Sequence, residues 1–388
     1  MLKHWTERPL ADLLATHGLV GVPERPFASN GWSGATLSSL DRPGDGRRFI
    51  LKRTSWAIDW IARSTRDHAL REGFVASMPL PLPEPLVAPY FGAGNEGTAV
   101  GLLMPDLSDR LLPWEGAAGE PPLDIGSLER ILAGLARLHA MPWPIADTVD
   151  STSVWPSVPW RERLLLLSPR SGAALAAEGV AAGERFSEGW AAFARQATPA
   201  ARALVARLDD DPEPLLDALS TLPRTGLHGD LKLANIAFLD ERRICLIDWQ
   251  MTALAPVAIE LGWMLVTNSA SLPEPPESIV RRYRAAVEST SGAPISLSPP
   301  FDPNLAYPSS AVEATAGLES QPAFRASEEV IGDWDAQLDL TWIVGLLLRG
   351  WRKGIDAESS AVLGSGVSAA DDLAWWCSKA TEAAGRRL

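Results

Sequence analysis

The sequence predicts an α+β fold in two parts: a small antiparallel β part with one helix, followed by a larger and mostly helical part. Up to about residue 105, short apolar runs alternate with clusters of turn residues, a pattern typical of strands. Beyond this point apolar residues recur at helical spacing, apart from one hairpin pattern near residue 240. The 388 residues suffice for two or three lobes, and we expect an N-terminal lobe at 1–105 and a C-terminal lobe at 106–388.

In the first part we expect strands at Phe49–Lys52 and Thr98–Met104, because both runs are apolar and bounded by turn residues or proline. Between them, Ser64–Ser77 is predicted to form one helix, with Ser64 or Thr65 as its N-cap. The proline-rich segment 79–85 cannot continue a helix, so we expect it to be an extended connector.

The second part begins with a predicted helix in which Leu128, Ile131, Leu132, Leu135 and Leu138 form one apolar stripe. Residues 268–310 are rich in Ser and Pro around a single helix, and we interpret them as a surface excursion or a lid. Further helices are expected at Trp160–Leu167, Glu184–Gln196, Pro199–Leu208, Glu277–Val287, Trp334–Trp351 and Val367–Arg387.

Composition narrows the classes of function. A hydrophobic content of 46% with 21% charged residues is ordinary for a soluble globular protein. The net charge of −13 argues against a nucleic-acid binder and mildly favours a cationic substrate, although excess acid also serves solubility. Two cysteines supply neither a disulfide framework nor a thiolate metal site. Without an apolar leader or a membrane-spanning run, we expect a cytoplasmic protein with no membrane partner.

The segment most informative about function begins with His228-Gly229-Asp230-Leu231-Lys232-Leu233-Ala234-Asn235. Two apolar runs follow, 236–239 and 244–247, separated by four polar residues. Two such runs about a short polar turn predict a β-hairpin, in which we expect Ile236 to lie opposite Ile247. The residues flanking the two runs, Asn235 and Asp248, would then meet roughly 5 Å apart, within reach of Asp230.

Asp230, Asn235 and Asp248 provide two carboxylates and one amide oxygen, which are hard ligands suited to Mg²⁺. Phosphoryl transfer uses such a set, because the metal neutralises phosphate charge while a carboxylate orients the attacking hydroxyl and accepts its proton. Kinases place the base Asp first, a metal-binding Asn five residues later, and a second metal-binding Asp after a hairpin. This chain has that spacing. Lys232 would either contact the γ-phosphate or face solvent.

Each of these residues also has an ordinary structural explanation. A His-Gly-Asp tripeptide is often only a turn, and an Asp at a strand end is common. The joint arrangement on one predicted loop and hairpin favours the catalytic interpretation. We interpret His228 as a structural residue that braces the loop, because no second His lies at ligand spacing from it.

These motifs resemble those of the aminoglycoside phosphotransferase and choline kinase group, within the protein-kinase-like fold. The resemblance rests on His228–Asn235 and Ile247-Asp248-Trp249, with weaker support from Leu135–Ala140 and Leu102–Leu107. It covers residues 20–265. It implies a two-lobed fold and Mg²⁺-dependent transfer of the γ-phosphoryl group of ATP or GTP to a hydroxyl of a small molecule.

The resemblance also implies roles for single residues. Asp230 would be the catalytic base, and Asn235 and Asp248 would hold Mg²⁺. Lys52 would bind the α- and β-phosphates of the nucleotide, with Glu72 as its ion-pair partner.

Further nucleotide contacts are implied on the same basis. The segment Asn30–Ala35, with Ser33 and Gly34, would take the place of the loop over the phosphates, although its two glycines depart from the usual glycine-rich pattern. Met104 and Asp106 would present backbone groups to the adenine.

The sequence leaves the acceptor open between an aminoglycoside, a sugar, an amino sugar and an amino alcohol. Trp249-Gln250 stands where protein kinases have Phe-Gly, which favours a small-molecule acceptor. Tryptophan rings can stack on sugars or hold ammonium groups, and acids can bind amines, but each such residue is more often core or plain surface. The candidates are Trp155, Trp160, Trp190, Trp249, Trp263, Trp334, Trp342, Trp351, Glu260, Asp333, Asp335 and Asp339.

Two other classes of function compete with this interpretation. A catalytically weak, pseudokinase-type nucleotide-binding regulator would keep the fold, but the joint presence of the lysine, the base and the metal ligands argues against it. A metal-dependent phosphoesterase using His228 and Asp230 would need several His ligands, and none of the other His residues forms a close pair with His228.

Overall fold

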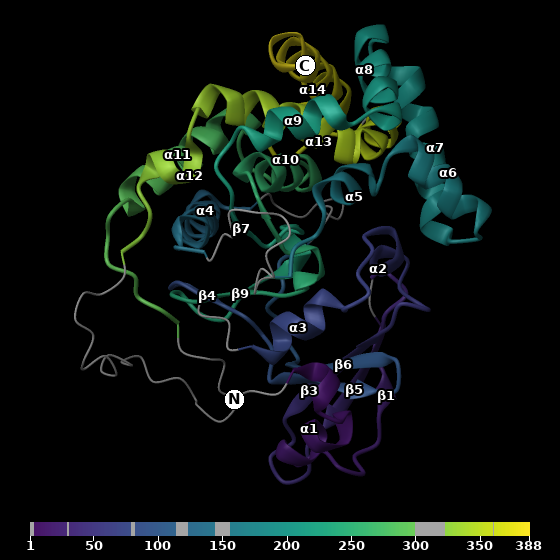
Figure 1. Cartoon of the computed structure of the whole chain (residues 1–388), viewed down its shortest axis with the longest axis vertical. Helices are drawn as coiled ribbons and strands as arrows, with labels where there is room; N and C mark the ends of the chain where they lie inside the picture. Colours follow the sequence, from purple (N-terminus) through teal and green to yellow (C-terminus); the bar gives the residue numbers. More distant parts are fainter. Residues whose placement is uncertain are drawn as a thin grey trace. The chain divides into compact units, whose positions relative to one another are not determined.

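The computed structural model describes residues 4–28, 31–78, 82–113, 123–143, 156–298, 323–359 and 361–388. The chain forms two compact units (Figure 1). Unit 1 comprises Met1–Leu111, Ile236–Gln250 and Gly292–Phe324, and unit 2 comprises Leu112–Asn235, Met251–Ser291 and Arg325–Leu388. The lobe boundary at residue 105 remains a prediction, since the compact units are assembled from several separate stretches of the chain.

Unit 1 is built on a five-stranded antiparallel sheet with the strand order β1-β2-β3-β6-β5. The two strands expected from the sequence are confirmed as β3 and β6, which pair with Lys52 opposite Leu102. The strands are β1 (Arg25–Pro26), β2 (Thr36–Asp41), β3 (Arg48–Thr54), β5 (Gly92–Glu96) and β6 (Ala99–Pro105).

The prediction of a single helix at Ser64–Ser77 is wrong. Two short helices stand there, α2 (Trp60–Ser64) and α3 (Arg71–Ser77). Between them, Arg66 and Leu70 adopt left-handed φ values of 51° and 52°, which a continuous helix does not allow. The carboxylate of Asp67 then accepts the backbone N–H of Arg71 at 2.9 Å and so starts the second helix.

The alternation of β3 and β6 decides which side chains meet which helix. Leu51 and Leu103 pack in one cluster with α1 (Leu10–Thr16), whereas Leu102 packs in another with α3. Successive side chains of a strand point to opposite faces, so Lys52 lies on the same face as Leu102, its pairing partner. Lys52 is thereby directed toward α3.

A β-hairpin also belongs to unit 1, but its register differs by one residue from the expected one. Strands β8 (Ile236–Phe238) and β9 (Ile244–Leu246) pair with Ile236 opposite Leu246, not Ile247. The reason is the turn, in which the Asp240 carboxylate accepts the N–H groups of two following arginines at 2.8 Å and closes a three-residue loop. Strand β4 (Leu86–Val87) adds to β9 in parallel.

Unit 2 is mostly helical, and all the helices predicted there are present. The long helix α13 (Trp334–Glu358) is packed against α7, α10 and α14. Of the Ser- and Pro-rich segment, residues 299–310 lie outside the described residues, as do 79–81 of the expected connector. The other helices are α4 (Ile125–Ala140), α5 (Trp160–Leu165), α6 (Pro169–Ala177), α7 (Ala181–Gln196), α8 (Pro199–Asp210), α9 (Glu213–Ser220), α10 (Val257–Thr267), α11 (Pro276–Thr290), α12 (Ser327–Ile331) and α14 (Ala369–Arg387).

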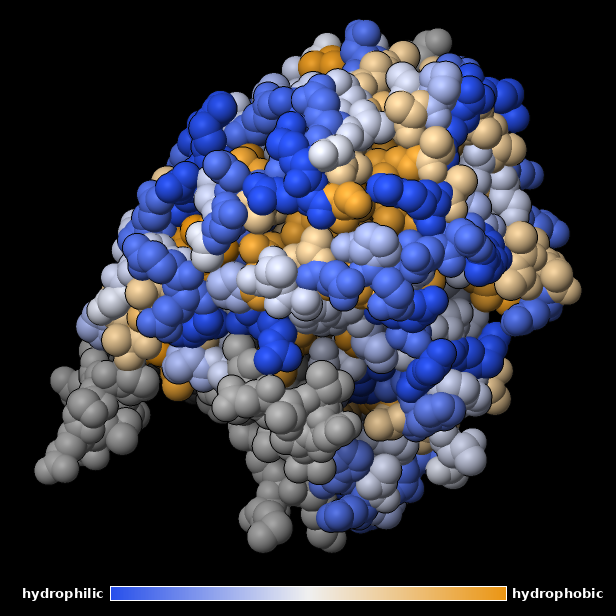
Figure 2. Space-filling model, turned by 45° about the horizontal axis from the view of Figure 1, so that its top comes forward, coloured by the Kyte–Doolittle hydropathy of each residue, from blue (hydrophilic) through white to orange (hydrophobic). Residues whose placement is uncertain are grey.

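The outer helices of unit 2 are amphipathic, and polar side chains cover most of the face seen in Figure 2, with apolar atoms visible between them. Helix α10 differs, since every residue from Val257 to Thr267 is buried. In the described part of the chain, no helix is long and apolar enough to cross a membrane. Because all of its residues are buried, the apolar helix α10 is the inner element of unit 2. A two-stranded antiparallel pair precedes it, β7 (Thr225–Leu227) with β10 (Ala253–Ala255).

Helix α10 approaches α13 closely at a pair of glycines. A Cβ atom on Gly262 would stand 2.8 Å from the Thr341 carbonyl oxygen and 3.0 Å from the Gly345 nitrogen, both backbone atoms of α13. Backbone atoms cannot turn aside as a side chain can. A side chain at Gly262 would force the two helices apart.

We expect Gly262→Ala to lower the free energy of unfolding by about 1–3 kcal/mol, because the added methyl group meets the α13 backbone. Gly385→Ala is the matched control, since Gly385 also lies in a helix but a Cβ there meets nothing within 4 Å. The control should be neutral or stabilising by up to about 1 kcal/mol through helix propensity. Urea unfolding of both variants measures the difference, and equal stability of the two would contradict the close approach.

Candidate active site

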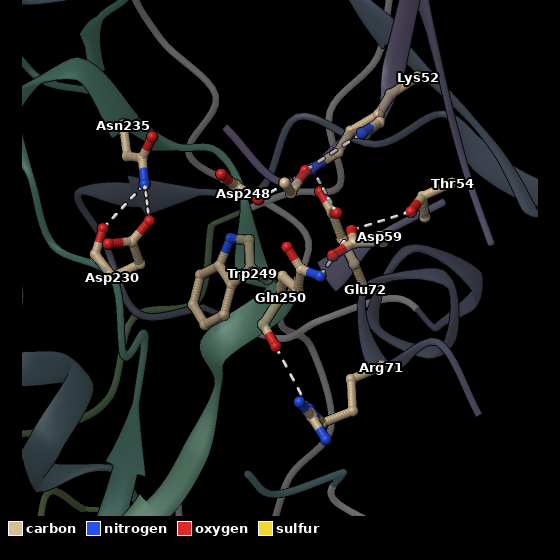
Figure 3. Close-up of polar contacts among 12 residues, drawn as sticks. Lys52, Thr54, Asp59, Arg71, Glu72, Asp230, Asn235, Asp248, Trp249 and Gln250 are labelled. Atoms are coloured by element: carbon tan, nitrogen blue, oxygen red, sulfur yellow. Dashed lines mark hydrogen bonds and ion pairs between the residues drawn. The ribbon is translucent and has the colours of Figure 1, made fainter. Parts of the chain in front are cut away.

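Lys52 lies at the centre of a partly buried ion-pair cluster in unit 1. Its Nζ lies 2.6 Å from Oε2 of Glu72 on α3 and 2.8 Å from Oδ1 of Asp248, which follows the hairpin (Figure 3). The other Glu72 oxygen accepts the hydroxyl of Tyr90 at 2.8 Å. The pairing of Lys52 with Glu72 is the one that the resemblance implies.

Burial and charge act in opposite directions on this cluster. Burial alone would lower the pKa of Lys52, but the charges of Asp248 and Glu72 outweigh it and raise the pKa above its usual value. Burial also raises the pKa of the Tyr90 hydroxyl, and the adjacent Glu72 adds to that effect. Two carboxylates about one ammonium leave a net charge of −1, which suits the approach of a cation.

The backbone fixes Asp248 in an unusual conformation. Its φ of 65° is left-handed, which Asp tolerates better than most residues and which often marks functional positions. The backbone N–H of the next residue, Trp249, donates to the Tyr90 hydroxyl at 3.3 Å, and the indole N–H donates to the Leu246 carbonyl at 2.8 Å. Asp248 is therefore held from both the hairpin and Tyr90.

Gln250 ties the chain after Asp248 to the helices of unit 1. Its Nε2 donates to Oδ2 of Asp59 at 2.9 Å, and that oxygen also accepts the Thr54 hydroxyl at 3.0 Å (Figure 3). The Gln250 carbonyl oxygen accepts Nε of the buried Arg71 at 3.2 Å. Sequence reasoning used Trp249-Gln250 to favour a small-molecule acceptor and missed this anchoring by Gln250.

In unit 2, Asp230 and Asn235 meet on one tight loop. Nδ2 of Asn235 donates to the Asp230 carbonyl oxygen at 2.8 Å and to Oδ2 of its carboxylate at 3.0 Å (Figure 3). A carbonyl oxygen can only accept, so this contact fixes the amide and turns its Oδ1 away from Asp230. Lys232 Nζ lies 3.0 Å from the same Asp230 oxygen. Lys232 is thus paired with the predicted base.

His228 and Gly229 shape the start of this loop. Nδ1 of the fully buried His228 lies 3.3 Å from the Asp230 backbone nitrogen, which is the bracing contact that we expect from the sequence. Gly229 has a φ of 84°, and a Cβ there would stand 1.8 Å from the Met251 carbonyl oxygen. Only glycine fits this position.

Glu260 on α10 anchors the loop, so this candidate acid has a structural role. It is fully buried, its Oε1 accepts the Gly229 N–H at 2.7 Å, and its Oε2 accepts the His228 N–H at 3.1 Å. The same Oε2 lies 3.0 Å from Nε2 of His139, whose Nδ1 contacts the Tyr283 hydroxyl at 2.7 Å. Both oxygens therefore serve the loop and its support.

The far end of the loop is held by Asn268, which follows α10. Its Oδ1 accepts the Leu233 N–H at 2.9 Å, and its Nδ2 donates to the Leu231 carbonyl oxygen at 3.0 Å. Sequence reasoning missed Asn268. For Glu260, a usable signal was present, because it is a single acid inside the apolar run Val257–Val266 and so needs buried partners.

Several predicted acceptor residues are core or structural. Asp339 is buried and pairs with Arg386 and Arg387. Asp333 accepts the Ala336 N–H as the N-cap of α13. Trp155 lies outside the described residues. Among the candidate tryptophans, those that the structure buries are Trp190, Trp249, Trp263, Trp342 and Trp351.

The predicted phosphate loop is described from residue 31 onward, and Asn30 lies outside the described residues. The loop is fastened to α2, since the Trp60 N–H donates to the Ser33 carbonyl oxygen at 3.0 Å and the Trp60 indole donates to that of Trp32 at 2.5 Å. Gly34 has a φ of 97°, and a Cβ there would stand 2.3 Å from the Ile58 carbonyl oxygen. This close approach to the Ile58 backbone is enough to require glycine at position 34, whether or not the loop binds a ligand.

The predicted adenine contacts lie where β6 ends. Met104 pairs with Ile50 of β3. The Asp106 N–H already donates to the Arg48 carbonyl oxygen at 3.3 Å. The backbone group of Asp106 that could bind the adenine ring is therefore its carbonyl oxygen. The carboxylate of Asp106 accepts the Ser108 N–H at 3.0 Å.

The residues predicted to hold Mg²⁺ have suitable chemistry. Asn235 turns its amide oxygen away from Asp230, and Asp248 is a carboxylate in a cluster of net negative charge. Within the described ranges, no three His, Cys, Asp or Glu side chains gather as a metal site. A ligand set of one amide and one carboxylate is compatible with that finding, since Mg²⁺ keeps waters and phosphate oxygens as its other ligands.

A family model supplies the identification. The model described as the phosphotransferase enzyme family matches residues 26–293, more than half of the chain, so the chain belongs to that family. The antiparallel sheet of unit 1 and the helices that follow confirm the predicted α+β, protein-kinase-like fold class. No curated protein matches the sequence.

The chain is distantly similar to solved structures of phosphotransferases. For the macrolide 2'-phosphotransferase of Brachybacterium faecium, the identity is 20%, the match covers 74% of this chain and 83% of that one, and the TM-score is 0.41. For the choline kinase of Streptococcus pneumoniae, the identity is 10%, the match covers 96% of this chain and 97% of that one, and the TM-score is 0.43. For the ethanolamine kinase of Plasmodium vivax, the identity is 12%, the match covers 95% of this chain and 85% of that one, and the TM-score is 0.45.

We expect Glu260→Gln to destabilise the protein at pH 7 by about 2–3 kcal/mol, because it weakens charge-assisted hydrogen bonds to the loop. Burial would raise the pKa of Glu260, but His139, His228 and the Gly229 N–H outweigh it and lower the pKa below its usual 4.5. The carboxylate therefore stabilises the fold above pH 4.5, and this contribution is lost as the pH falls through the folded pKa.

Urea unfolding at pH 7 and pH 4 measures this effect, and the stability gap between wild type and Glu260→Gln should narrow at pH 4. Glu188→Gln, at an exposed site on α7, is the control and should stay within about 0.5 kcal/mol of wild type at both values. A gap that is absent at pH 7 would contradict the anchoring role.

Proposed function

We propose that this protein is a small-molecule O-phosphotransferase that transfers the γ-phosphoryl group of ATP or GTP to a hydroxyl group, with Mg²⁺. The observation that carries the proposal is the loop of Asp230, whose carboxylate is fixed by Asn235 and Lys232 while Glu260 holds the loop backbone. A buried anchor of this kind presents one carboxylate in a set orientation, which is what a positioned general base requires.

Asp230 is the catalytic base in this proposal. The acceptor oxygen attacks the γ-phosphorus and forms a new P–O bond, the bond to the β,γ-bridging oxygen breaks, and the acceptor proton passes to a carboxylate oxygen of Asp230. Lys232 contributes positive charge beside that carboxylate, where charge accumulates on the transferred phosphoryl oxygens.

The nucleotide phosphates are assigned to Lys52, with Glu72 as its partner. Glu72 is bonded to both Lys52 and Tyr90, so the ammonium group is held on the α3 face of the sheet. A phosphate oxygen arriving there would replace Asp248 as the second anionic partner of Lys52. Ser33, Gly34, Met104 and Asp106 stay predicted nucleotide contacts.

Asn235 and Asp248 are the residues proposed to hold Mg²⁺, through the amide Oδ1 and the carboxylate. The ion, when bound, supplies charge neutralisation for the phosphates. If Asp248 holds the ion, its ion pair with Lys52 would break, and Lys52 would stay paired with Glu72. The acceptor in this proposal is an aminoglycoside, a sugar, an amino sugar or an amino alcohol.

Asp230→Asn should lower kcat by on the order of 10³-fold while nucleotide affinity changes by less than about threefold, because the isosteric amide cannot accept the acceptor proton. The measurement is a mass-spectrometric screen for acceptors that gain one phosphate, followed by steady-state kinetics on the best one. Asp217→Asn, at an exposed site on α9, is the control. A variant with near-normal turnover would refute the assignment. A chain that binds nucleotide but phosphorylates nothing would instead be the pseudokinase-type regulator.

Asp248→Asn should reduce the gain in nucleotide affinity that Mg²⁺ provides, by about tenfold, because a carboxylate ligand is replaced by a neutral amide. Calorimetric titration of ATP with Mg²⁺ and with EDTA measures this gain for wild type, for the variant and for Asp109→Asn, an exposed control in unit 1. An equal gain in all three proteins would exclude Asp248 as a metal ligand.

A further inference from the structure

Two buried arginines of unit 2 lie against the indole ring of Trp263. The guanidinium carbon of Arg163, on α5, is 4.7 Å from the ring centroid, and that of Arg349, on α13, is 5.6 Å from it. Each arginine is only 3% exposed. Two cations on one aromatic ring inside a protein are an uncommon arrangement, since burial of each charge opposes folding.

The helix packing explains how the cluster forms. Trp263 follows Gly262, the residue at which α10 meets the backbone of α13. Arg349 lies four residues after Gly345, the glycine on the α13 side of that approach, and so shares its face of the helix. Helix α5 also packs against α13 and brings Arg163 to the same ring.

Two N–H donors of this cluster, one on Arg163 and one on Trp263, have no acceptor within the described residues. Arg163 donates from Nη2 to the Gly229 carbonyl oxygen at 3.0 Å, but its Nε and the Trp263 Nε1 are buried with no hydrogen-bond partner in the described part of the chain. The acids that act on Arg163 are Asp230 and Glu260, and both Glu260 oxygens are engaged by the loop and His139. Buried N–H donors without acceptors cost free energy and call for an explanation.

The position of the cluster relates it to the reaction. The carbonyl group that Arg163 holds belongs to the residue directly before Asp230, the proposed base. Burial lowers the pKa of Arg163 to about 10, with Asp230 and Glu260 acting in the opposite direction, so the group is still a cation at neutral pH. An anionic group bound here would be adjacent to the catalytic loop.

We propose that Arg163, Trp263 and Arg349 bind an anionic oxygen group of the acceptor, a carboxylate or a phosphate ester, while the acceptor hydroxyl lies at Asp230. This inference rests on the proposed phosphoryl transfer, but it directs the choice of acceptor to hydroxylated acids, such as sugar acids and sugar phosphates, and away from the amines named above. The anion accepts from Nε of Arg163 and Nε1 of Trp263. Because these groups are covered, the side chains above them must move when the anion enters. The net charge of −13 favours cations only at long range, where salt screens it.

A purely structural role for Arg163 makes different predictions. If it only held the Gly229 carbonyl, its replacement would impair all acceptors equally through the loop. Recognition of an anion adds a rise in the KM of acidic acceptors to the loss through the loop, which acidic and neutral acceptors share. Arg161→Met is the matched control, because Arg161 lies on the same helix with an exposed ion pair to Glu213.

The first test measures binding without turnover. Melting temperatures are recorded with saturating Mg²⁺ and ADP, adding malonate, phosphate or chloride at equal ionic strength. Malonate or phosphate should raise Tm by about 3 °C or more over chloride in wild type and Arg161→Met. The shift should vanish in Arg163→Met and shrink in Trp263→Phe, which removes the indole N–H donor together with part of the aromatic ring system. Absence of an anion-specific shift, or an equal shift in Arg163→Met, would overturn the proposal.

The second test compares acceptors with matched hydroxyl groups: gluconate, glucose 6-phosphate, glucose and glucosamine. The carboxylate and phosphate arms distinguish the two sources of the anion. An acidic acceptor should have the highest kcat/KM, and Arg163→Met should raise the KM of that acceptor by about tenfold or more beyond any rise in the KM of glucose. Preference for glucose or glucosamine would overturn the inference and leave the proposed function intact. Phosphorylation of none would count against the proposed function, and the melting experiment would still decide the anion site.

Discussion

The buried carboxylate of Glu260 is the interaction on which the loop of unit 2 depends. It accepts the backbone N–H groups of His228 and Gly229, two donors that the left-handed turn at Gly229 leaves without a secondary-structure partner. A buried charge is stable only when its oxygens are fully engaged, and here His139 and the loop engage them. The position of Asp230 on its loop therefore depends on Glu260, an acid on helix α10.

A second balance of charges organises unit 1. Lys52 lies between Glu72 and Asp248, so one ammonium group joins the sheet, α3 and the segment after the hairpin. Such a centre has a defined geometry, yet it retains one excess negative charge and an exchangeable partner. In the proposed function, the same three side chains would serve both stability and cation binding.

The sequence predicted much of this because its signals are local. Helical periodicity placed the helices of unit 2, and the spacing of Asp230 and Asn235 predicted a loop on which they now meet. The errors arose where a few hydrogen bonds outweigh periodicity. Asp67 restarts a helix after two left-handed residues, and the Asp240 turn shifts the hairpin register by one. Neither contact has a distinct sequence pattern.

The sequence by itself determined the fold class, the family and the loop residues, because these depend on periodicity and on residues close together in the chain. Only the tertiary structure decided the long-range partners, since pairing across more than thirty residues leaves no spacing to read. Glu260 under the loop and Arg163 against Trp263 are of this kind. Burial made the difference, because a carboxylate or guanidinium removed from water must find whichever partner the packed helices bring to it.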